Sequence, residues 1–259
     1  MDHLDDYILF AQSLADIARP VLINAYETGF DYETKEDGSP VTEVDRHIET
    51  LLRREITIRY PEHGILGEEF GSQGLDNEFI WVIDPIDGTR SFTLGLPTFG
   101  CLIALCHKGK PVVGIIEAPI ARLRAIGAKG RETLCNGKPV HTRDCGSLSQ
   151  AVLSDWTNNT NRPDEAGAER LKASVNWSVR DGGCISYISL ARGFVDFCID
   201  GNLDAYDFCA LVPVIEGAGG IISDWDGEPL TITSGRLVIA AGSVGCHQEA
   251  LKLLNESDV

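Results

Sequence analysis

The stretch that decides the fold is WVIDPIDGTRSF, residues 81–92. Its apolar start leads directly into two aspartates, Asp84 and Asp87, that flank a proline and an isoleucine. The apolar run predicts a buried strand, yet a carboxylate without a partner is costly to bury. We therefore expect a positively charged partner where this strand ends.

The composition is that of an ordinary globular enzyme with an unusual charge. The chain has 259 residues, 43% of them hydrophobic and 24% charged, which is enough for one large domain or two closely packed ones. The net charge of -17 argues against nucleic acid and against an anionic membrane as partners, because both need basic patches.

The cysteines and the N-terminus predict a cytoplasmic protein. The eight cysteines form no C-x-x-C pair and have no zinc-site spacing, and most lie in apolar runs. We expect reduced core residues rather than a disulfide framework. The first ten residues lack the pattern of a signal peptide, and no apolar run approaches the ~20 residues of a membrane-spanning helix.

The hydrophobic pattern changes along the chain. Helical spacing over 4–28 and from Thr42 onward predicts a helix pair, with a polar loop over 31–41. Short β-like runs from 63 to about 135 predict a sheet with hairpin connections. Strands and helices then alternate, which is typical of α/β packing. The expected helices of this second part cover 164–174, 184–193, 205–217 and 245–255.

Further acids stand at the ends of other expected elements. Glu68 and Glu69 follow a short strand, Asp207 opens a helix, and Asp45 lies in the first turn of the second helix. Magnesium is usually held by a few carboxylates together with substrate phosphate. Acids at separate element ends fit magnesium better than a calcium loop, whose ligands share one stretch of about 12 residues.

Simpler explanations exist for most of these residues. Asp45 fits the acidic position of a T-x-x-D capping box, and Asp207 fits a helix N-cap. Glu68-Glu69 fits a solvated charge pair, and Gly88-Thr89 fits an ordinary turn. Only DPIDGT, residues 84–89, has no such simple explanation, because the apolar residues before it favour burial whereas its acids disfavour burial.

Four motifs together resemble those of the inositol monophosphatase superfamily in order and spacing, over essentially the whole chain. They are KEDGSPVTEVD (35–45), GEE (67–69), DPIDGT (84–89) and YDFCA…EGAGG (206–220). The resemblance implies a magnesium-dependent phosphomonoesterase of the α/β (α+β) class, with alternating α-β-α-β-α layers. It implies an N-terminal subdomain (1–145) with a helix pair and an antiparallel sheet, and a C-terminal α/β subdomain (146–259).

The resemblance also implies ligands for two to three Mg²⁺ ions per active site. Glu68, Asp84 and the carbonyl of Ile86 would hold one ion. Asp84, Asp87 and Asp207 would hold a second, and Glu68 would serve a third through water. Two metal ions ~3.5–4 Å apart stabilise both the attacking and the leaving oxygen of a displacement. Magnesium would then be the partner that the buried aspartates require.

Catalytic and phosphate-binding roles follow from the same resemblance. Asp45 and the Thr89 hydroxyl would polarise the attacking water, with Glu68 as a further catalytic residue. The backbone amides of Gly88 and Thr89, next to Asp87, would hold phosphate oxygens, which suits the partial positive charge of a helix N-terminus.

The substrate-facing segments look most like the histidinol-phosphatase branch. HGILGEE (63–69) and DGTRSF (87–92) fit that branch, with Ser91 where inositol phosphatases usually have Asn. The residue before Asp207 is Tyr, where they commonly have Trp. Ser91 and Asp207 are therefore expected to contact the substrate, which we predict to be L-histidinol phosphate.

Three further residues bear on the substrate. The branch usually reads R-x-G-G-D-C-Y, whereas residues 180–184 read RDGGC, as though the acid after the glycines were deleted. Arg180 is expected to contact the substrate, and Asp181 either replaces the missing acid or is a solvated turn residue. Asp200 either faces the substrate, where a carboxylate suits an ammonium group or a sugar hydroxyl, or is a strand-end acid.

Three functions stay open at this point. The first is hydrolysis of L-histidinol phosphate in histidine biosynthesis, and the second is an inositol- or sugar-phosphate phosphatase with the same machinery. The third is a non-catalytic metal-binding or regulatory protein. The expected partner is a small phosphate monoester, without nucleic acid or membrane, and relatives suggest a homodimer.

Overall fold

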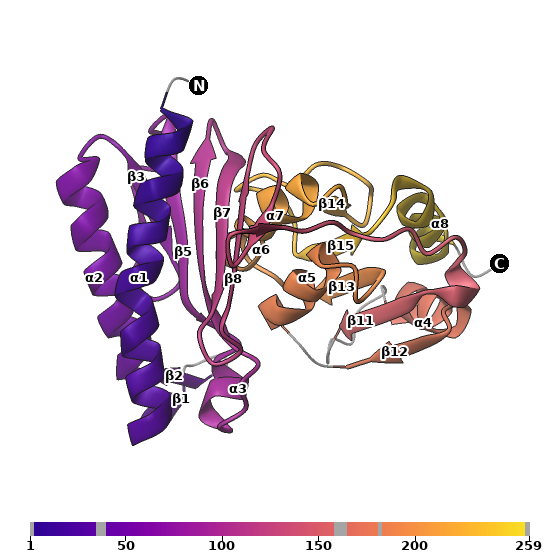
Figure 1. The fold of residues 1–259 in the computed structure, drawn as a ribbon, viewed down its shortest axis with the longest axis horizontal. Helices are drawn as coiled ribbons and strands as arrows, with labels where there is room; N and C mark the ends of the chain where they lie inside the picture. Colours follow the sequence, from indigo (N-terminus) through magenta and orange to yellow (C-terminus); the bar gives the residue numbers. More distant parts are fainter. Residues whose placement is uncertain (1–2, 35–39, 158–164, 181–182, 257–259) are drawn as a thin grey trace.

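The computed structural model describes residues 3–34, 40–157, 165–180 and 183–256 as five alternating layers of helix and sheet (Figure 1). The first helix layer covers one face of an eight-stranded sheet, and a middle helix layer separates this sheet from a five-stranded one. A last helix layer covers the far face of the second sheet. The expected α-β-α-β-α class is confirmed. The first helix layer contains α1 (Leu4–Thr28) and α2 (Glu43–Arg59). The middle layer contains α5 (Gly183–Ala191), α6 (Ala205–Phe208) and α7 (Leu211–Gly217). The last layer contains α4 (Glu165–Ser174) and α8 (Val244–Asn255).

Helix α1 covers the first sheet with a face of small and branched apolar residues. Ala11, Leu14, Ala18 and Leu22 repeat at helical spacing and are buried. By length and composition alone α1 could also cross a membrane, contrary to the sequence expectation, and it is the one such helix among the described residues. A core helix passes the same test, and here the buried residues of α1 share one core with α2 and the sheet.

The eight-stranded sheet is mixed rather than purely antiparallel. β3 and β5 run parallel to each other, and every other pair is antiparallel. Between β3 and β5 in the chain lies the short edge strand β4, which pairs with the outer side of β3. The strand order is β10 (Lys138–Pro139), β9 (Leu134–Cys135), β8 (Leu123–Ala128), β7 (Lys110–Ala118), β6 (Gly100–His107), β5 (Phe79–Asp87), β3 (Gly64–Gly67), β4 (Gly71–Gln73).

The expected central strand is β5, and it becomes irregular where its acids lie. Asp84 pairs with Leu102 of β6, but Asp87 pairs with Gly100, so β5 contains one extra residue between these points. Pro85 has no N–H to donate to the ladder, which favours a bulge here. The irregularity turns the end of a buried strand into a site.

The five-stranded sheet combines parallel and antiparallel pairs. β11 runs parallel to its neighbours β12 and β13, while β15 runs antiparallel to β13 and β14. The order is β12 (Trp177–Val179), β11 (Val152–Trp156), β13 (Phe197–Gly201), β15 (Leu237–Ala241), β14 (Ile221–Asp224).

Two local expectations are wrong. The loop expected over 31–41 contains strands β1 (Tyr32–Thr34) and β2 (Pro40–Thr42), which pair with each other; residues 35–39 lie outside the described residues. The single helix expected over 205–217 is divided into α6 and α7. Pro213 explains the division, because its missing N–H and its ring disfavour a continuous helix through residues 209–210.

The boundary expected near residue 145 lies between the two sheets, but the two halves of the chain pack against each other. Strands of the larger sheet end at Pro139, and those of the smaller one begin at Val152. However, α5 and α7 share one apolar core with the larger sheet, so the two halves meet over a dry interface. The division into 1–145 and 146–259 stays a prediction.

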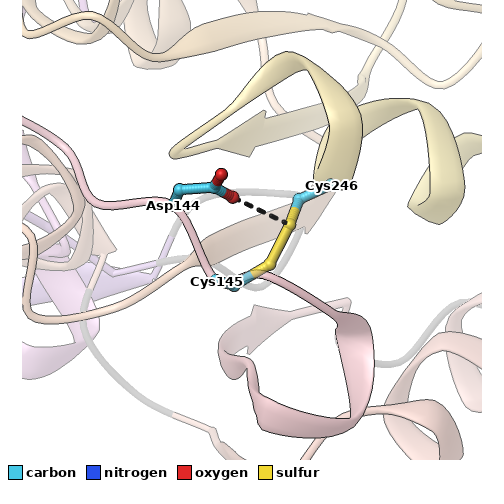
Figure 2. A group of neighbouring side chains, drawn as sticks. All are labelled: Asp144, Cys145 and Cys246. Carbon is cyan, nitrogen blue, oxygen red and sulfur yellow. Dashed lines mark hydrogen bonds between the residues drawn. A yellow bond between two sulfur atoms is a disulfide. The ribbon is translucent and has the colours of Figure 1, made fainter.

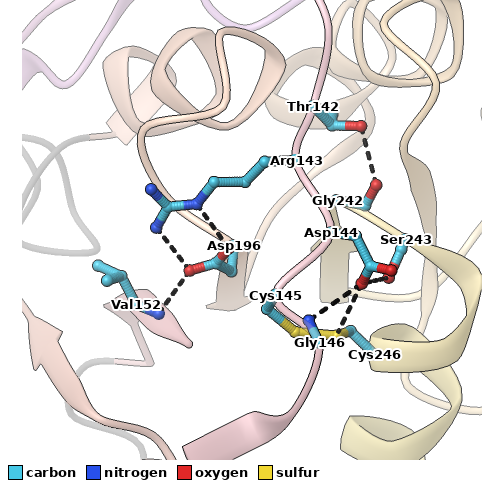
Figure 3. Close-up of polar contacts among 10 residues, drawn as sticks. All are labelled: Thr142, Arg143, Asp144, Cys145, Gly146, Val152, Asp196, Gly242, Ser243 and Cys246. Atoms are coloured by element: carbon cyan, nitrogen blue, oxygen red, sulfur yellow. Dashed lines mark hydrogen bonds and ion pairs between the residues drawn. A yellow bond between two sulfur atoms is a disulfide. The ribbon is translucent and has the colours of Figure 1, made fainter. Parts of the chain in front are cut away.

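A disulfide joins Cys145, in the connection between the two sheets, to Cys246 in the first turn of α8 (Figure 2). The expectation that all eight cysteines are reduced is therefore wrong for this pair, whereas the other six are free and buried. The two cysteines are 101 residues apart, so only the tertiary fold brings them together. Nearby, Asp144 accepts a hydrogen bond from Ser243 (2.9 Å) (Figure 3).

A paired interaction next to the disulfide fixes the same connection. Arg143 forms two hydrogen bonds of 2.7 Å with the buried carboxylate of Asp196, which also accepts the N–H of Val152 (2.7 Å) (Figure 3). The connection is thus anchored at the start of β11 and at the start of α8.

We expect the Cys145–Cys246 bond to stabilise the protein by restricting the unfolded chain. A loop of ~100 residues corresponds to about 4–5 kcal/mol, or roughly 10 °C in melting temperature. Cys246→Ser should therefore melt lower than the wild type in oxidising buffer. Dithiothreitol should lower the wild type to the level of the variant and leave the variant unchanged. Cys145→Ser is the matched control and should behave in the same way. A wild type that melts identically with and without dithiothreitol would contradict this expectation.

Candidate active site

Three aspartates from the two halves of the chain meet at the end of β5. One carboxylate oxygen from each of Asp84, Asp87 and Asp207 lies within 4.8 Å of the others. Burial, followed by the charges of neighbouring acids, raises the pKa of Asp84 and of Asp207 well above the usual range. Among the described residues no lysine or arginine forms an ion pair with these three. The cluster therefore suits a cation with hard oxygen ligands.

Each of these carboxylates is oriented by a backbone N–H. The amide of Ile86 donates to Asp84 Oδ1 (2.9 Å), and the amide of Cys184 donates to Asp87 Oδ2 (2.8 Å). An amide fixes the direction of a carboxylate but does not neutralise its charge. The bond from Cys184 also crosses between the halves, since it joins the end of β5 to the start of α5.

Asp207 is positioned by a capping box. Asp204 is the N-cap of α6, and its N–H donates to Asp207 Oδ2 (2.6 Å). The N-cap interpretation of Asp207 is thus wrong, because Asp207 occupies the third position of the helix instead.

Asp45 has the same local geometry on α2. Thr42 is the N-cap, its N–H donates to Asp45 Oδ2 (2.8 Å), and the expected capping box is present. The other oxygen, Oδ1, is buried and has no hydrogen-bond partner among the described residues. Burial raises the pKa of Asp45 to about 6, against the lowering effect of the bonds from Thr42. Capping therefore uses one oxygen and leaves the other available for a water molecule.

Glu68 follows β3 and lies beside the aspartate cluster. It is half-buried, and its charge helps to raise the pKa of Asp84 and of Asp207. Its N–H donates to the carbonyl of Ile83 (3.3 Å), which holds the turn against β5.

Glu49 of α2 positions this turn, and sequence reasoning missed it. Its buried carboxylate accepts the N–H of Glu69 (2.7 Å) and of Phe70 (3.1 Å), and it pairs with Arg53 (2.7 Å). A Cβ atom at Gly67 would lie 2.1 Å from this carboxylate, so the approach requires glycine. The available signal was the spacing of Glu49, one helical turn after Asp45.

The chain turns from β5 into the short helix α3 (Thr89–Thr93) at Gly88. Gly88 has φ +82°, and a Cβ atom there would lie 2.9 Å from the Thr98 carbonyl oxygen, so only glycine fits. The Thr89 hydroxyl donates to the carbonyl of Ile86 (2.9 Å). The amides of Gly88 and Thr89 thus open a helix beside the aspartates, which is a suitable place for phosphate.

A cavity adjoins the cluster and contains five of the predicted site residues. Residues that the sequence reasoning missed complete it, chiefly aromatic and aliphatic side chains from separate segments. Among the described residues, the lining consists of Asp87, Gly88, Ser91, Thr98, Trp156, Gly183, Cys184, Tyr187, Asp200, Leu203, Asp207 and Leu211. Thr98, Trp156, Tyr187 and Leu203 belong to no motif that the sequence analysis used, and only their shared cavity identifies them.

Asp200 lies near the end of β13, as a strand-end acid would, but its side chain lines the cavity. It is buried and accepts a hydrogen bond from the Tyr187 hydroxyl (2.6 Å). Burial raises the pKa of Asp200 to about 8, against the lowering effect of Tyr187.

The segment that departs from the histidinol-phosphatase pattern is only partly in the cavity. Arg180 does not belong to the cavity lining and lies 3.8 Å from Asp155, and Asp181 is outside the described residues. Cys184 occupies the position after the glycines and is buried, and its N–H donates a hydrogen bond to Asp87. A carboxylate at this position would add another negative charge beside Asp87.

The comparisons with known proteins agree with this fold. The family model described as "Inositol monophosphatase family" matches residues 3–258. The bifunctional phosphatase IMPL2 of Arabidopsis thaliana chloroplasts is 41% identical, over 97% of this chain and 75% of that protein. The histidinol-phosphatase of Mycobacterium tuberculosis is 34% identical, over 96% of this chain and 98% of that one. A solved inositol monophosphatase from Zymomonas mobilis superposes with a TM-score of 0.88 at 38% identity, covering 97% and 98% of the two chains.

Fold, site and relatives define a phosphoric monoester hydrolase of a metal-dependent kind. The chain belongs to the inositol monophosphatase family.

We expect Asp200 to lower the stability of the protein as pH rises. Its pKa is 3.8 when unperturbed and about 8 in the fold, so the unfolded chain releases the proton first. The stability that protonated Asp200 contributes is therefore fully present below pH 4 and is lost between pH 4 and about pH 8. Asn cannot ionise but can still accept the Tyr187 hydroxyl. Asp200→Asn should therefore melt higher than the wild type at pH 8 in EDTA, with a smaller difference near pH 4. Equal differences at both pH values would refute the raised pKa.

Proposed function

We propose that this protein hydrolyses a phosphate monoester with two to three Mg²⁺ ions held by Glu68, Asp84, Asp87, Asp207 and the carbonyl of Ile86. The convergence of three aspartates without a basic partner among the described residues carries the proposal. The oriented but uncompensated carboxylates fit the donor set that magnesium requires. When bound, the ions supply positive charge to the phosphate and make a nearby water more acidic.

The side chains of this protein supply the rest of the mechanism. Asp45 Oδ1, buried and without a hydrogen-bond partner among the described residues, accepts a proton from the attacking water. The Thr89 hydroxyl donates to Ile86 and so presents its lone pairs to the same water. The amides of Gly88 and Thr89 hold phosphate oxygens at the start of α3. Glu49 maintains the turn that carries Glu68.

We propose L-histidinol phosphate as the substrate, hydrolysed to L-histidinol and phosphate. Asp200 supports this choice, because it adds to the cavity a carboxyl group that is not one of the three clustered aspartates, and an ammonium group there would favour its ionised form and bind it. Ser91 lies in the same lining and is the residue that resembles the histidinol-phosphatase branch. Relatives named histidinol-phosphatase, 32–34% identical, support it further.

An inositol- or sugar-phosphate phosphatase is the second candidate. The similarity to the Zymomonas mobilis inositol monophosphatase favours it, and Asp200 could accept sugar hydroxyls as well. A non-catalytic role is disfavoured, because every residue that the reaction needs is present.

A homodimer and a cytoplasmic location complete the proposal. Six buried free cysteines fit a reducing compartment. The Cys145–Cys246 disulfide provides the test, because a reducing compartment opposes such a bond: if mass measurement of alkylated protein from intact cells found this pair fully oxidised, the cytoplasmic location would be contradicted. Sedimentation would establish the dimer.

We expect Asp84→Asn to remove most activity while preserving the fold. The substitution removes the charge at the centre of the cluster, although its amide oxygen can still accept the N–H of Ile86. Initial rates with and without EDTA measure the metal dependence directly. Magnesium should raise the melting temperature of the wild type more than that of the variant. Equal wild-type rates in EDTA and in magnesium would exclude the mechanism.

We expect the wild type to prefer L-histidinol phosphate over inositol monophosphate. A charge-assisted hydrogen bond contributes ~1.5–3 kcal/mol, so Asp200→Asn should lower kcat/KM for the cationic substrate by roughly one to two powers of ten. The loss for inositol monophosphate should be smaller, because an amide also binds hydroxyls. Asp76→Asn, an exposed acid of the first half, is the control. If inositol monophosphate were turned over at least as efficiently, the histidinol assignment would be abandoned.

A further inference from the structure

Two neighbouring strands of the five-stranded sheet contribute side chains to the lining of the cavity. Trp156, the last residue of β11, is the register partner of Asp200 on the parallel strand β13. Side chains of directly paired residues project to the same face of a sheet. Both residues line the cavity, so an indole and a carboxylate lie side by side in it.

Side chains along β11 and β13 alternate between the two faces of the sheet, and this alternation supports the placement of Trp156 and Asp200. On the same face as Trp156, Ser154 forms a 2.7 Å hydrogen bond with Ser186 of α5. On the opposite face, Leu153 and Ile199 belong to the outer core under α4 and α8. Trp156 is thus directed toward the middle layer, where the cavity lies, and not toward the outer helices.

The carboxylate of this pair is held in place. The Tyr187 hydroxyl donates to Asp200 Oδ2 at 2.6 Å, and Tyr187 itself is buried in the same lining. One oxygen of Asp200 is therefore committed to Tyr187, which makes Tyr187 a positioning residue. Leu203 and Leu211 add apolar side chains to the same lining.

We propose that Trp156 determines specificity by stacking on a planar, nitrogen-containing ring of the alcohol part of the substrate, while Asp200 binds a cationic group beside it. An indole face attracts flat rings and cations, and the neighbouring carboxylate favours positive charge. A polyol ring is neither flat nor charged and gains little from such a surface. The inference rests on the proposed phosphatase function and narrows its substrate class to esters with an aromatic ring and a cationic group.

Three probe substrates separate the contributions. L-histidinol phosphate carries both a ring and an ammonium group, phosphoethanolamine carries only the ammonium group, and glycerol phosphate carries neither. Trp156→Ala should lower kcat/KM for L-histidinol phosphate about 5- to 30-fold, mainly through KM. The loss for the two probes without a ring should be less than about threefold. Trp156→Phe, which keeps an aromatic face, should recover most of the loss.

The neighbouring strand offers a matched control. Trp177 of β12 is 55% exposed and does not line the cavity, so Trp177→Ala should change none of the three rates. Melting temperatures of all variants verify that they fold.

Binding measured by intrinsic fluorescence is an independent readout. L-histidinol with inorganic phosphate should change the tryptophan fluorescence of the wild type, and Trp156→Phe should abolish the change although Trp81, Trp177 and Trp225 remain. Equal loss on all three probes in Trp156→Ala, or an unchanged fluorescence response in Trp156→Phe, would overturn the role of Trp156. If the wild type turned over none of the probes with magnesium, the proposed function would be refuted instead. The fluorescence measurement would then still test whether Trp156 contacts the ligand.

Discussion

The mutual repulsion of Asp84, Asp87 and Asp207 is the constraint on which the rest of the structure depends. These carboxylates are brought within 4.8 Å of one another from a strand of the first half and a helix of the second. Burial raises their pKa values, so the fold carries a cost that a bound cation would remove. The bulge in β5, the glycine at 88 and the hydrogen bond from Cys184 all serve to hold this arrangement.

Local helix capping uses two of the residues to which the proposed chemistry is assigned. Asp45 and Asp207 each occupy the third position of a capping box, which binds one carboxylate oxygen to the N-cap N–H. The geometry that begins each helix thereby orients an acid toward the site. A capping interpretation of such a motif is consequently no argument against a catalytic role. Glu49 acts one step further away, by holding the turn that carries Glu68.

In the proposed function, chemistry and specificity depend on different elements that line one cavity. The phosphate end is built by β5, α3 and α6 and is anionic, whereas Trp156, Tyr187 and Asp200 come from β11, α5 and β13. The second sheet is tied to the connecting segment by the Cys145–Cys246 bond and by the Arg143–Asp196 pair. If Trp156 and Asp200 act as proposed, they select the alcohol while the phosphate machinery stays the same.

The sequence by itself determined the layered fold, most elements and the acids that gather at the site. Periodicity suffices for the elements, because helix faces and buried strands are local patterns, whereas the layers and the gathering of the acids were implied by the resemblance of four motifs to a known family. The parallel pairing of β3 with β5, the break before α7 and the disulfide were missed, since each depends on partners distant in the chain or on packing. The tertiary structure alone decided that Trp156 lies beside Asp200 and that Arg180 lies outside the cavity lining, because strand register and the path of the chain, not sequence spacing, place these side chains.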